Sequence, residues 1–206
     1  MSFSPQGDRI AIATKDGQIL VLDPRHAESV QAGKAHDSPR SFQIAWVDTE
    51  HLVSVGFSRG SQRKINLYRL PSSSSSSNPT ASPIETISSI TIDVSPSVLF
   101  PIYDPDTSIL YIWGKGERVI QTFEIHPDHA REPIAKLPSY TAGSPQVAVA
   151  FLPKRVVDVK KVEVGKALRL TAKTLEEVTF SIPRNKVSRR SDLACLERLV
   201  RSQRLC

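Results

Sequence analysis

Cysteine is nearly absent from this chain of 206 residues. Its two cysteines, Cys195 and Cys206, lie close to the end, so the rest of the chain cannot form a disulfide framework, which favours a reducing compartment. Long apolar runs are missing as well, and no segment approaches the roughly 18 residues of a membrane span. The residues after Met1 lack the build of a signal peptide. We therefore expect a cytoplasmic protein with no transmembrane segment.

Positive charge is in excess, but it is confined to one segment. The formal net charge is +6, with an isoelectric point near 9.5. Residues 184–206 contain seven basic and two acidic residues, so five of the six net positive charges lie there. Nucleic-acid binding needs a broad cationic face, which the nearly neutral body does not offer. We therefore predict no nucleic-acid partner.

Three stretches repeat a pattern of short apolar runs separated by turn residues. In the first, two runs flank Asp16-Gly17, a pair that predicts a hairpin with a type I′ turn. The second starts at His36-Asp37. The apolar runs of the first stretch are residues 9–14 and 18–24. Those of the second are 41–47, 51–58 and 64–70, and those of the third are 98–103, 109–114 and 119–125. Such runs are typical of propeller blades of about 40–45 residues, which cannot bury their faces without neighbours.

The repeats predict an all-β fold: a partial WD40-type β-propeller of about four blades with a C-terminal extension. We assign the blades to residues 1–146, with a disordered serine-rich insert at 71–83 and a strand after it at 84–92. Further strands are predicted at 147–152 and 178–182, the second being the last, within a region of final strands and extension at 147–186. Residues 187–206 form a basic tail, in which 192–201 could be a short helix with Leu193, Leu196, Leu199 and Val200 on one face.

Three short motifs could carry chemistry, and each has a structural alternative. Asp104-Pro105-Asp106 could bind calcium, but its residue types favour a turn. Gly114-Lys115-Gly116 lacks the spacing of a phosphate-binding loop and no helix follows, so a hairpin is favoured. His126 and His129 lie near Asp128 without a third fixed ligand, which favours a surface loop over a metal site.

A fourth set, His36, Ser54 and Trp46, invites comparison with a catalytic triad. In a blade, however, a histidine before the first strand and a serine on the second belong to a buried hydrogen-bonded network. No serine lies in a Gly-x-Ser-x-Gly context. We therefore predict no enzyme activity, no catalytic residue, no cofactor and no metal.

Several segments, in order, resemble the coronins, the actin-associated propeller proteins. The most specific is Leu99-Phe100-Pro101-Ile102-Tyr103-Asp104-Pro105-Asp106-Thr107. The others are Gly56-Phe57-Ser58-Arg59 with Ser61-Gln62-Arg63, Gly114-Lys115-Gly116, residues 119–124, Phe151-Leu152-Pro153-Lys154-Arg155, Asp158-Val159 and Ile182-Pro183-Arg184. The resemblance covers roughly residues 3 to 186. Residues 92–97 and 167–170 look closer to the branch of the family that carries two propellers.

The resemblance implies a non-enzymatic, cytoskeleton-associated protein that binds F-actin or actin-regulatory proteins. The candidate contacts are basic residues in turns: Arg59, Arg63, Lys64, Lys115 and Arg118. The alternative is an interaction scaffold in membrane trafficking without direct actin binding. The chain shows no sustained heptads, so we expect no coiled coil for oligomerisation. Residues 187–206 depart from the family pattern and are interpreted as possible unspliced intron.

Overall fold

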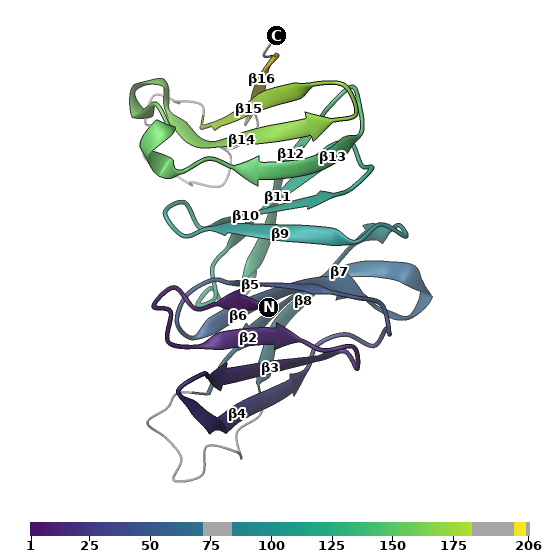
Figure 1. Ribbon diagram of the computed structural model, residues 1–206, viewed down its shortest axis with the longest axis vertical. Helices are drawn as coiled ribbons and strands as arrows, with labels where there is room; N and C mark the ends of the chain where they lie inside the picture. The colour runs from purple at the N-terminus through teal and green to yellow at the C-terminus, as the bar shows by residue number, and fades with distance from the viewer. Residues whose placement is uncertain (72–83, 183–199, 205–206) are drawn as a thin grey trace. The chain divides into compact units, whose positions relative to one another are not determined.

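A computed structural model of the protein describes residues 1–71, 84–182 and 200–204 and shows four sheets of four strands each (Figure 1). The first sheet contains β1 (Ser2–Phe3), β2 (Ile10–Ala13), β3 (Gln18–Asp23) and β4 (His26–Lys34). The second contains β5 (Gln43–Trp46), β6 (His51–Phe57), β7 (Gln62–Arg69) and β8 (Glu85–Val94). Each strand of these two sheets pairs with its sequence neighbour in antiparallel orientation.

The third and fourth sheets follow in the same manner. The third contains β9 (Leu99–Asp104), β10 (Ile109–Gly114), β11 (Val119–Ile125) and β12 (Ile134–Thr141). The fourth is antiparallel and contains β13 (Gln146–Phe151), β14 (Glu163–Thr171), β15 (Leu175–Ser181) and β16 (Val200–Arg204). Three short 3-10 turns complete the described elements: η1 (Arg59–Ser61), η2 (Lys154–Val156) and η3 (Val159–Lys161).

The chain divides into two compact units. The first comprises Met1–Tyr111 and Phe123–Ala135, and the second comprises Ile112–Thr122 and Lys136–Cys206. The third sheet therefore contributes residues to both. The four sheets confirm the prediction of an all-β, propeller-like fold.

The core of the first unit lies between the first and second sheets. Every residue of β6 is buried, because this inner strand is covered on both faces, whereas β8 at the edge has no buried residue. The cluster combines residues of β2, β3, β5, β6 and β7 with three that flank strands: Ala11, Ile19, Val21, Phe42, Trp46, Leu52, Tyr68, Leu70 and Ile84. The tryptophan indole also donates to the Ser2 carbonyl at 3.0 Å, which ties β1 to β5.

The predicted strands in all three repeats are confirmed, as are those at 84–92 and 147–152. Five strands were missed: β1, β4, β12, β14 and β16. In β4 the short polar sequence His-Ala-Glu-Ser-Val-Gln-Ala-Gly-Lys carries a weak apolar pattern, and the pairing with β3 decides its conformation. The predicted serine-rich insert at 71–83 lies outside the described residues, except for Pro71.

The expectation that 178–182 holds the last strand is wrong, because β16 follows it in the same sheet. β16 pairs with β15 from Glu176↔Arg204 to Phe180↔Val200. Val200 and Arg201 were predicted to end a helix, and they are extended instead. A short isolated helix is marginal in water, whereas an open sheet edge offers hydrogen-bond partners to every second residue. The rest of that helix, 192–199, lies outside the described residues.

The hairpin at Asp16-Gly17 is confirmed, but the predicted type I′ turn is wrong. Gly17 has φ +75°, whereas Asp16 is not among the residues with positive φ. The amide of Gly17 donates to the Thr14 carbonyl at 3.3 Å, and the amide of Thr14 donates to the Gln18 carbonyl at 2.9 Å. This geometry is a type I turn followed by a left-handed glycine bulge, which requires positive φ at the glycine alone.

Replacement of Gly17 by alanine is expected to destabilise the protein more than the same change at Gly7. Both glycines have positive φ, which costs an alanine about 1–2 kcal/mol. A Cβ at Gly17 would also lie 2.3 Å from the His36 carbonyl oxygen, a backbone atom, whereas nothing lies within 4 Å at Gly7. We expect Gly17→Ala to lower the free energy of unfolding, measured in urea, by about 1–3 kcal/mol more than Gly7→Ala does. Equal losses for the two variants would contradict the close approach.

Candidate partner-binding surface and the polar networks behind it

A buried hydrogen-bond network runs across the second sheet. His36 precedes β5, and its Nε2 lies 2.8 Å from the Ser54 hydroxyl of β6, which in turn lies 3.0 Å from the Tyr68 hydroxyl of β7. Asn66 donates to the Tyr68 hydroxyl at 3.0 Å and to the Ala35 carbonyl at 2.8 Å. The interpretation of His36 and Ser54 as a structural network is confirmed, because the four side chains that form it are all buried in the fold.

Trp46 does not belong to this network, and Tyr68 and Asn66 were missed. The indole of Trp46 faces Arg9, whose guanidinium carbon lies 5.4 Å from its ring centroid. Tyr68 and Asn66 alternate on β7 and therefore point to one face, a signal that the period of a strand contains. Burial raises the pKa of the Tyr68 phenol, which therefore stays a neutral hydrogen-bond partner.

Burial also lowers the pKa of His36 to about 4, with Asp37 opposing and Lys64 reinforcing the shift. The ring is therefore neutral in the folded protein at neutral pH. In this form one ring nitrogen donates and the other accepts, and the serine hydroxyl can take either role in its contact with Nε2.

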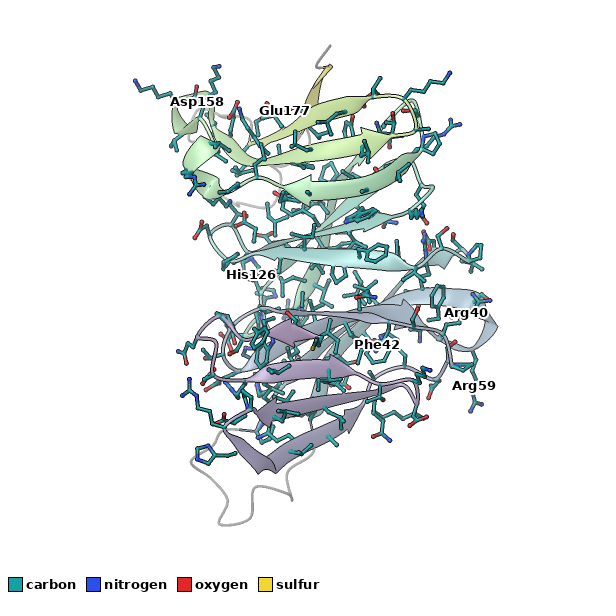
Figure 2. All side chains as sticks on the ribbon, in the orientation of Figure 1. Arg40, Phe42, Arg59, His126, Asp158 and Glu177 are labelled. Carbon is teal, nitrogen blue, oxygen red and sulfur yellow. The ribbon has the colours of Figure 1, made fainter. Side chains whose placement is uncertain are left out.

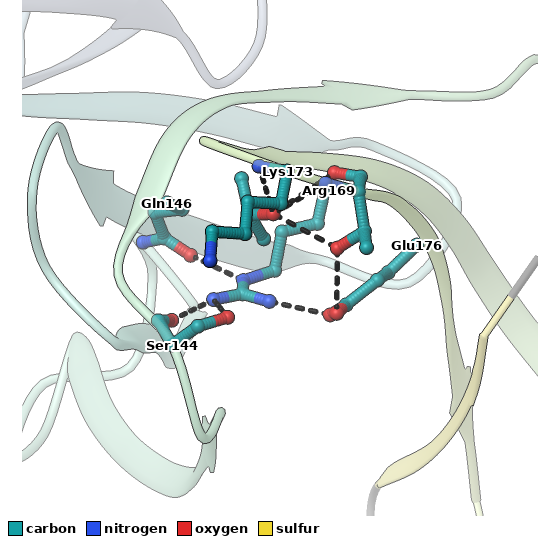
Figure 3. Close-up of polar contacts among 7 residues, drawn as sticks. Ser144, Gln146, Arg169, Lys173 and Glu176 are labelled. Carbon is teal, nitrogen blue, oxygen red and sulfur yellow. Dashed lines mark hydrogen bonds and ion pairs between the residues drawn. The ribbon is translucent and has the colours of Figure 1, made fainter.

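A second buried network occupies the fourth sheet, around a fully buried arginine (Figure 3). The Arg169 guanidinium contacts Glu176 at 2.5 Å, the side chain of Gln146 at 3.3 Å, and both the carbonyl and the hydroxyl of Ser144. Thr174 donates to the second carboxylate oxygen of Glu176 at 3.1 Å. The charge is thus paired and most of its donors are satisfied, which is the condition for burying it.

Around η1, the first unit gathers four cations at one end of β7, of which Lys64 is half-buried and the other three are exposed. The guanidinium carbon of Arg40 lies 5.0 Å from the ring centroid of Phe57. The Lys34 ammonium pairs with Asp37 at 2.5 Å, and Lys34, then Arg59 and Lys64, lower the pKa of the Asp37 carboxyl. We call Lys34, Arg40, Arg59 and Lys64 the basic edge of the first unit. Arg40 and Arg59 lie on the same side of it (Figure 2).

The structure places the five predicted contact residues in three different settings. Arg59 and Lys64 belong to the basic edge. Arg63 is only 3% exposed, and its guanidinium bonds both Asp93 carboxylate oxygens at 2.5 Å and the Ser97 carbonyl at 3.2 Å, so it joins β7 to β8 and the segment after it. Lys115 and Arg118 are exposed at the β10–β11 turn of the second unit. The sequence analysis did not include Arg40 and Lys34 among the candidate contacts, because only the folded structure brings them to this edge.

The remaining motifs adopt the structures that we favoured. Asp104 accepts from the Asp106 amide at 3.3 Å and from the Thr107 hydroxyl at 2.5 Å, which makes a turn. Gly116 has φ +83° in the hairpin between β10 and β11. His126 and His129 lie in the loop between β11 and β12, where His126 pairs with Glu124 at 2.9 Å.

Within the described ranges, no group of three or more His, Cys, Asp or Glu side chains could hold a metal ion. The same part of the chain contains no helix long and apolar enough to serve as a membrane span.

The low pKa of His36 predicts a loss of stability in mild acid. The unfolded state takes up the proton near pH 6.5 and the folded state near pH 4, so stability is lost as the pH falls through this window. The contribution is about 3 kcal/mol. In chemical unfolding, the free energy of unfolding of the unaltered protein should exceed that of His36→Gln at pH 7, and this excess should fall by about 3 kcal/mol between pH 7 and pH 4. A difference independent of pH would refute the burial of a neutral ring; His129→Gln, in an exposed loop, is the control.

Arg169 and Glu176 should show strong energetic coupling. Arg169→Met leaves the Glu176 carboxylate buried without its cation, which is expected to cost about 3–5 kcal/mol. In the double variant with Glu176→Leu, the loss should be well below the sum of the two single losses. A double-mutant cycle from urea unfolding measures the coupling. Additive losses would mean that the pair is solvated.

No model of a protein family matches the sequence. Among characterised proteins, Coronin-7 of Bos taurus is 32% identical over 186 residues and Coronin-7 of Homo sapiens 33% identical over 186 residues, in both cases 89% of this chain. The coronin-like protein crn1 of Schizosaccharomyces pombe is 30% identical over 197 residues, or 94% of the chain. The chain spans 19% of the length of the two Coronin-7 proteins and 30% of crn1.

Solved structures give the same result. The WD40 domain of Toxoplasma gondii coronin superposes with a TM-score of 0.76 and 25% identity, over 88% of this chain and 45% of that one. The WD40 domain of SCAP from fission yeast superposes with a TM-score of 0.56 at 14% identity, over 100% of this chain and 40% of that one, and shows the fold alone. The WD40-type propeller fold is thereby confirmed, and the chain belongs to the coronin family of WD-repeat proteins.

Proposed function

We propose that this chain binds filamentous actin through the basic edge of its first unit and so takes part in organising the actin cytoskeleton in the cytoplasm. The observation that carries the proposal is the convergence of Lys34, Arg59 and Lys64 around a single exposed carboxylate, Asp37. Arg40, over the ring of Phe57, adds a fourth cation to the basic edge. The similarity to coronins supports the choice of partner. Complementary charge steers association with an acidic surface and fixes its orientation.

The basic edge is suited to contact because the fold holds it in place. Arg59 stands on η1, where Gly60 has φ +81°, and the Ser58 amide donates to the Gln62 carbonyl at 2.8 Å. Arg40 lies on the aromatic face of Phe57, itself buried in β6. A rigid sheet that presents variable loops at its ends is the usual way in which propellers bind partners. No enzymatic step is part of the proposal.

Arg63 is excluded from the contact surface because its charge is used within the fold. Lys115 and Arg118 remain candidate contacts of the second unit and are tested separately. The further assignment to the branch with two propellers also stays a proposal, supported by the similarity of residues 92–97 and 167–170.

Actin co-sedimentation of the double variant Arg59→Glu/Lys64→Glu tests this function. We expect about tenfold weaker binding or more, and pelleting of the unaltered chain should decrease as salt rises. Arg25→Glu/Arg69→Glu makes the same change in charge at the opposite ends of β3–β4 and β7, and it should bind normally. Lys115→Glu/Arg118→Glu reports on the second unit.

Two results would reject the proposal. If the unaltered chain does not pellet with filaments, the alternative of a scaffold in membrane trafficking without direct actin binding is favoured. If the control pair weakens binding as much as the edge pair does, the attraction comes from net charge and not from the basic edge.

A further inference from the structure

The turn between β13 and β14 combines exposed cations with exposed valines. Residues 153–161, here called the 153–161 segment, have the sequence Pro-Lys-Arg-Val-Val-Asp-Val-Lys-Lys and contain η2 and η3. The side chain of Val159 is 78% exposed and that of Val156 45%. Four exposed basic residues lie on either side of them: Lys154, Arg155, Lys160 and Lys161.

The acidic groups of this turn are used internally. Asp158 accepts from the Lys160 amide at 3.0 Å and pairs with Lys161 at 3.6 Å. Glu163, at the start of β14, accepts from the Asp158 amide at 2.8 Å and pairs with Lys166 at 3.2 Å. The outward charge of the 153–161 segment is therefore positive.

Backbone hydrogen bonds hold the segment in one conformation. The amides of Val156, Val157 and Val162 donate to the carbonyls three residues before them at 3.1 Å each. Val162 has φ +58°, an uncommon value for a β-branched residue, and its carbonyl accepts from Ile182. Such positions persist only where the surroundings impose them, and they concentrate at functional sites. An ordered segment also loses little conformational entropy on binding.

We propose that the 153–161 segment is a docking site for an anionic lipid bilayer. Cations bind the headgroups, and Val156 and Val159 enter the boundary between headgroups and acyl chains. An apolar tip flanked by lysine and arginine is the composition of interfacial membrane-binding segments. Each basic residue near an anionic leaflet adds to the attraction. An acidic protein surface would use the cations but offers no reason to expose Val159, and the site projects as a turn, on which Asp158 lies (Figure 2).

Vesicle flotation with the full chain tests the proposal. The chain should bind phosphatidylcholine vesicles that contain about one third phosphatidylserine, fail to bind pure phosphatidylcholine, and lose binding as salt rises. Lys160→Glu/Lys161→Glu should weaken binding more than about twentyfold, since two attractive charges become repulsive. Arg131→Glu/Lys136→Glu changes the net charge equally at exposed positions outside the segment and should bind like the unaltered chain.

A second pair of variants separates insertion from attraction by charge. Val159→Ser keeps every charge, and burial of the valine side chain predicts a loss of up to about tenfold. In Val159→Trp, the added indole emission should shift to the blue on anionic vesicles and be quenched by brominated acyl chains. All these positions are exposed, so the melting temperatures should match that of the unaltered chain.

Three outcomes would overturn the proposal: equal binding to both vesicle types, unchanged binding of Val159→Ser, or vesicle binding that survives Lys160→Glu/Lys161→Glu. Loss of filament binding in that double variant, with no vesicle binding by the unaltered chain, would assign the segment to an acidic protein. The actin proposal depends on other residues of the first unit, so either proposal can fail alone.

Discussion

The structure depends on covering both faces of the inner strands. Every residue of β6 is buried, and Leu52, Val53 and Ser54 have essentially no exposed surface. Neither face of a strand in this position is exposed to water, so neighbouring sheets must supply apolar surface to both sides. Each polar side chain that remains inside must find its partners there, because an unsatisfied buried polar group costs about as much as several buried methylenes gain.

The two buried networks are different solutions to this constraint. In the second sheet, His36, Ser54, Tyr68 and Asn66 form a neutral chain of hydrogen bonds. In the fourth sheet, the charged pair Arg169 and Glu176 occupies the interior, with Ser144 and Gln146 taking up the other guanidinium donors. The neutral network responds to acid through its histidine. The charged one is more sensitive to loss of a single partner, since removal of either residue leaves an unpaired ion.

Because strands and their faces are committed to the core, the turns at the strand ends are free to evolve toward partners. The basic edge and the 153–161 segment are both of this kind, and each is held by backbone hydrogen bonds and a residue with positive φ, Gly60 or Val162. They belong to different units and differ in character. One is cationic around a carboxylate and an aromatic ring, whereas the other places cations around exposed valines.

Local pattern alone determined that this protein is a series of hairpins of the propeller type. The period of two in residues such as Ile65 and Leu67, and the turn residues between the apolar runs, carry that information, because both act over a few positions. The tertiary structure decided what depends on distant pairing. It made strands of β4 and β16, set a glycine bulge at Gly17, and buried Arg63 against Asp93 while leaving Arg59 exposed. Two arginines four residues apart look alike in sequence. Arg63 lies beside Asp93 of β8, which neutralises its charge inside the fold, whereas Arg59 lies on η1, where its charge stays exposed.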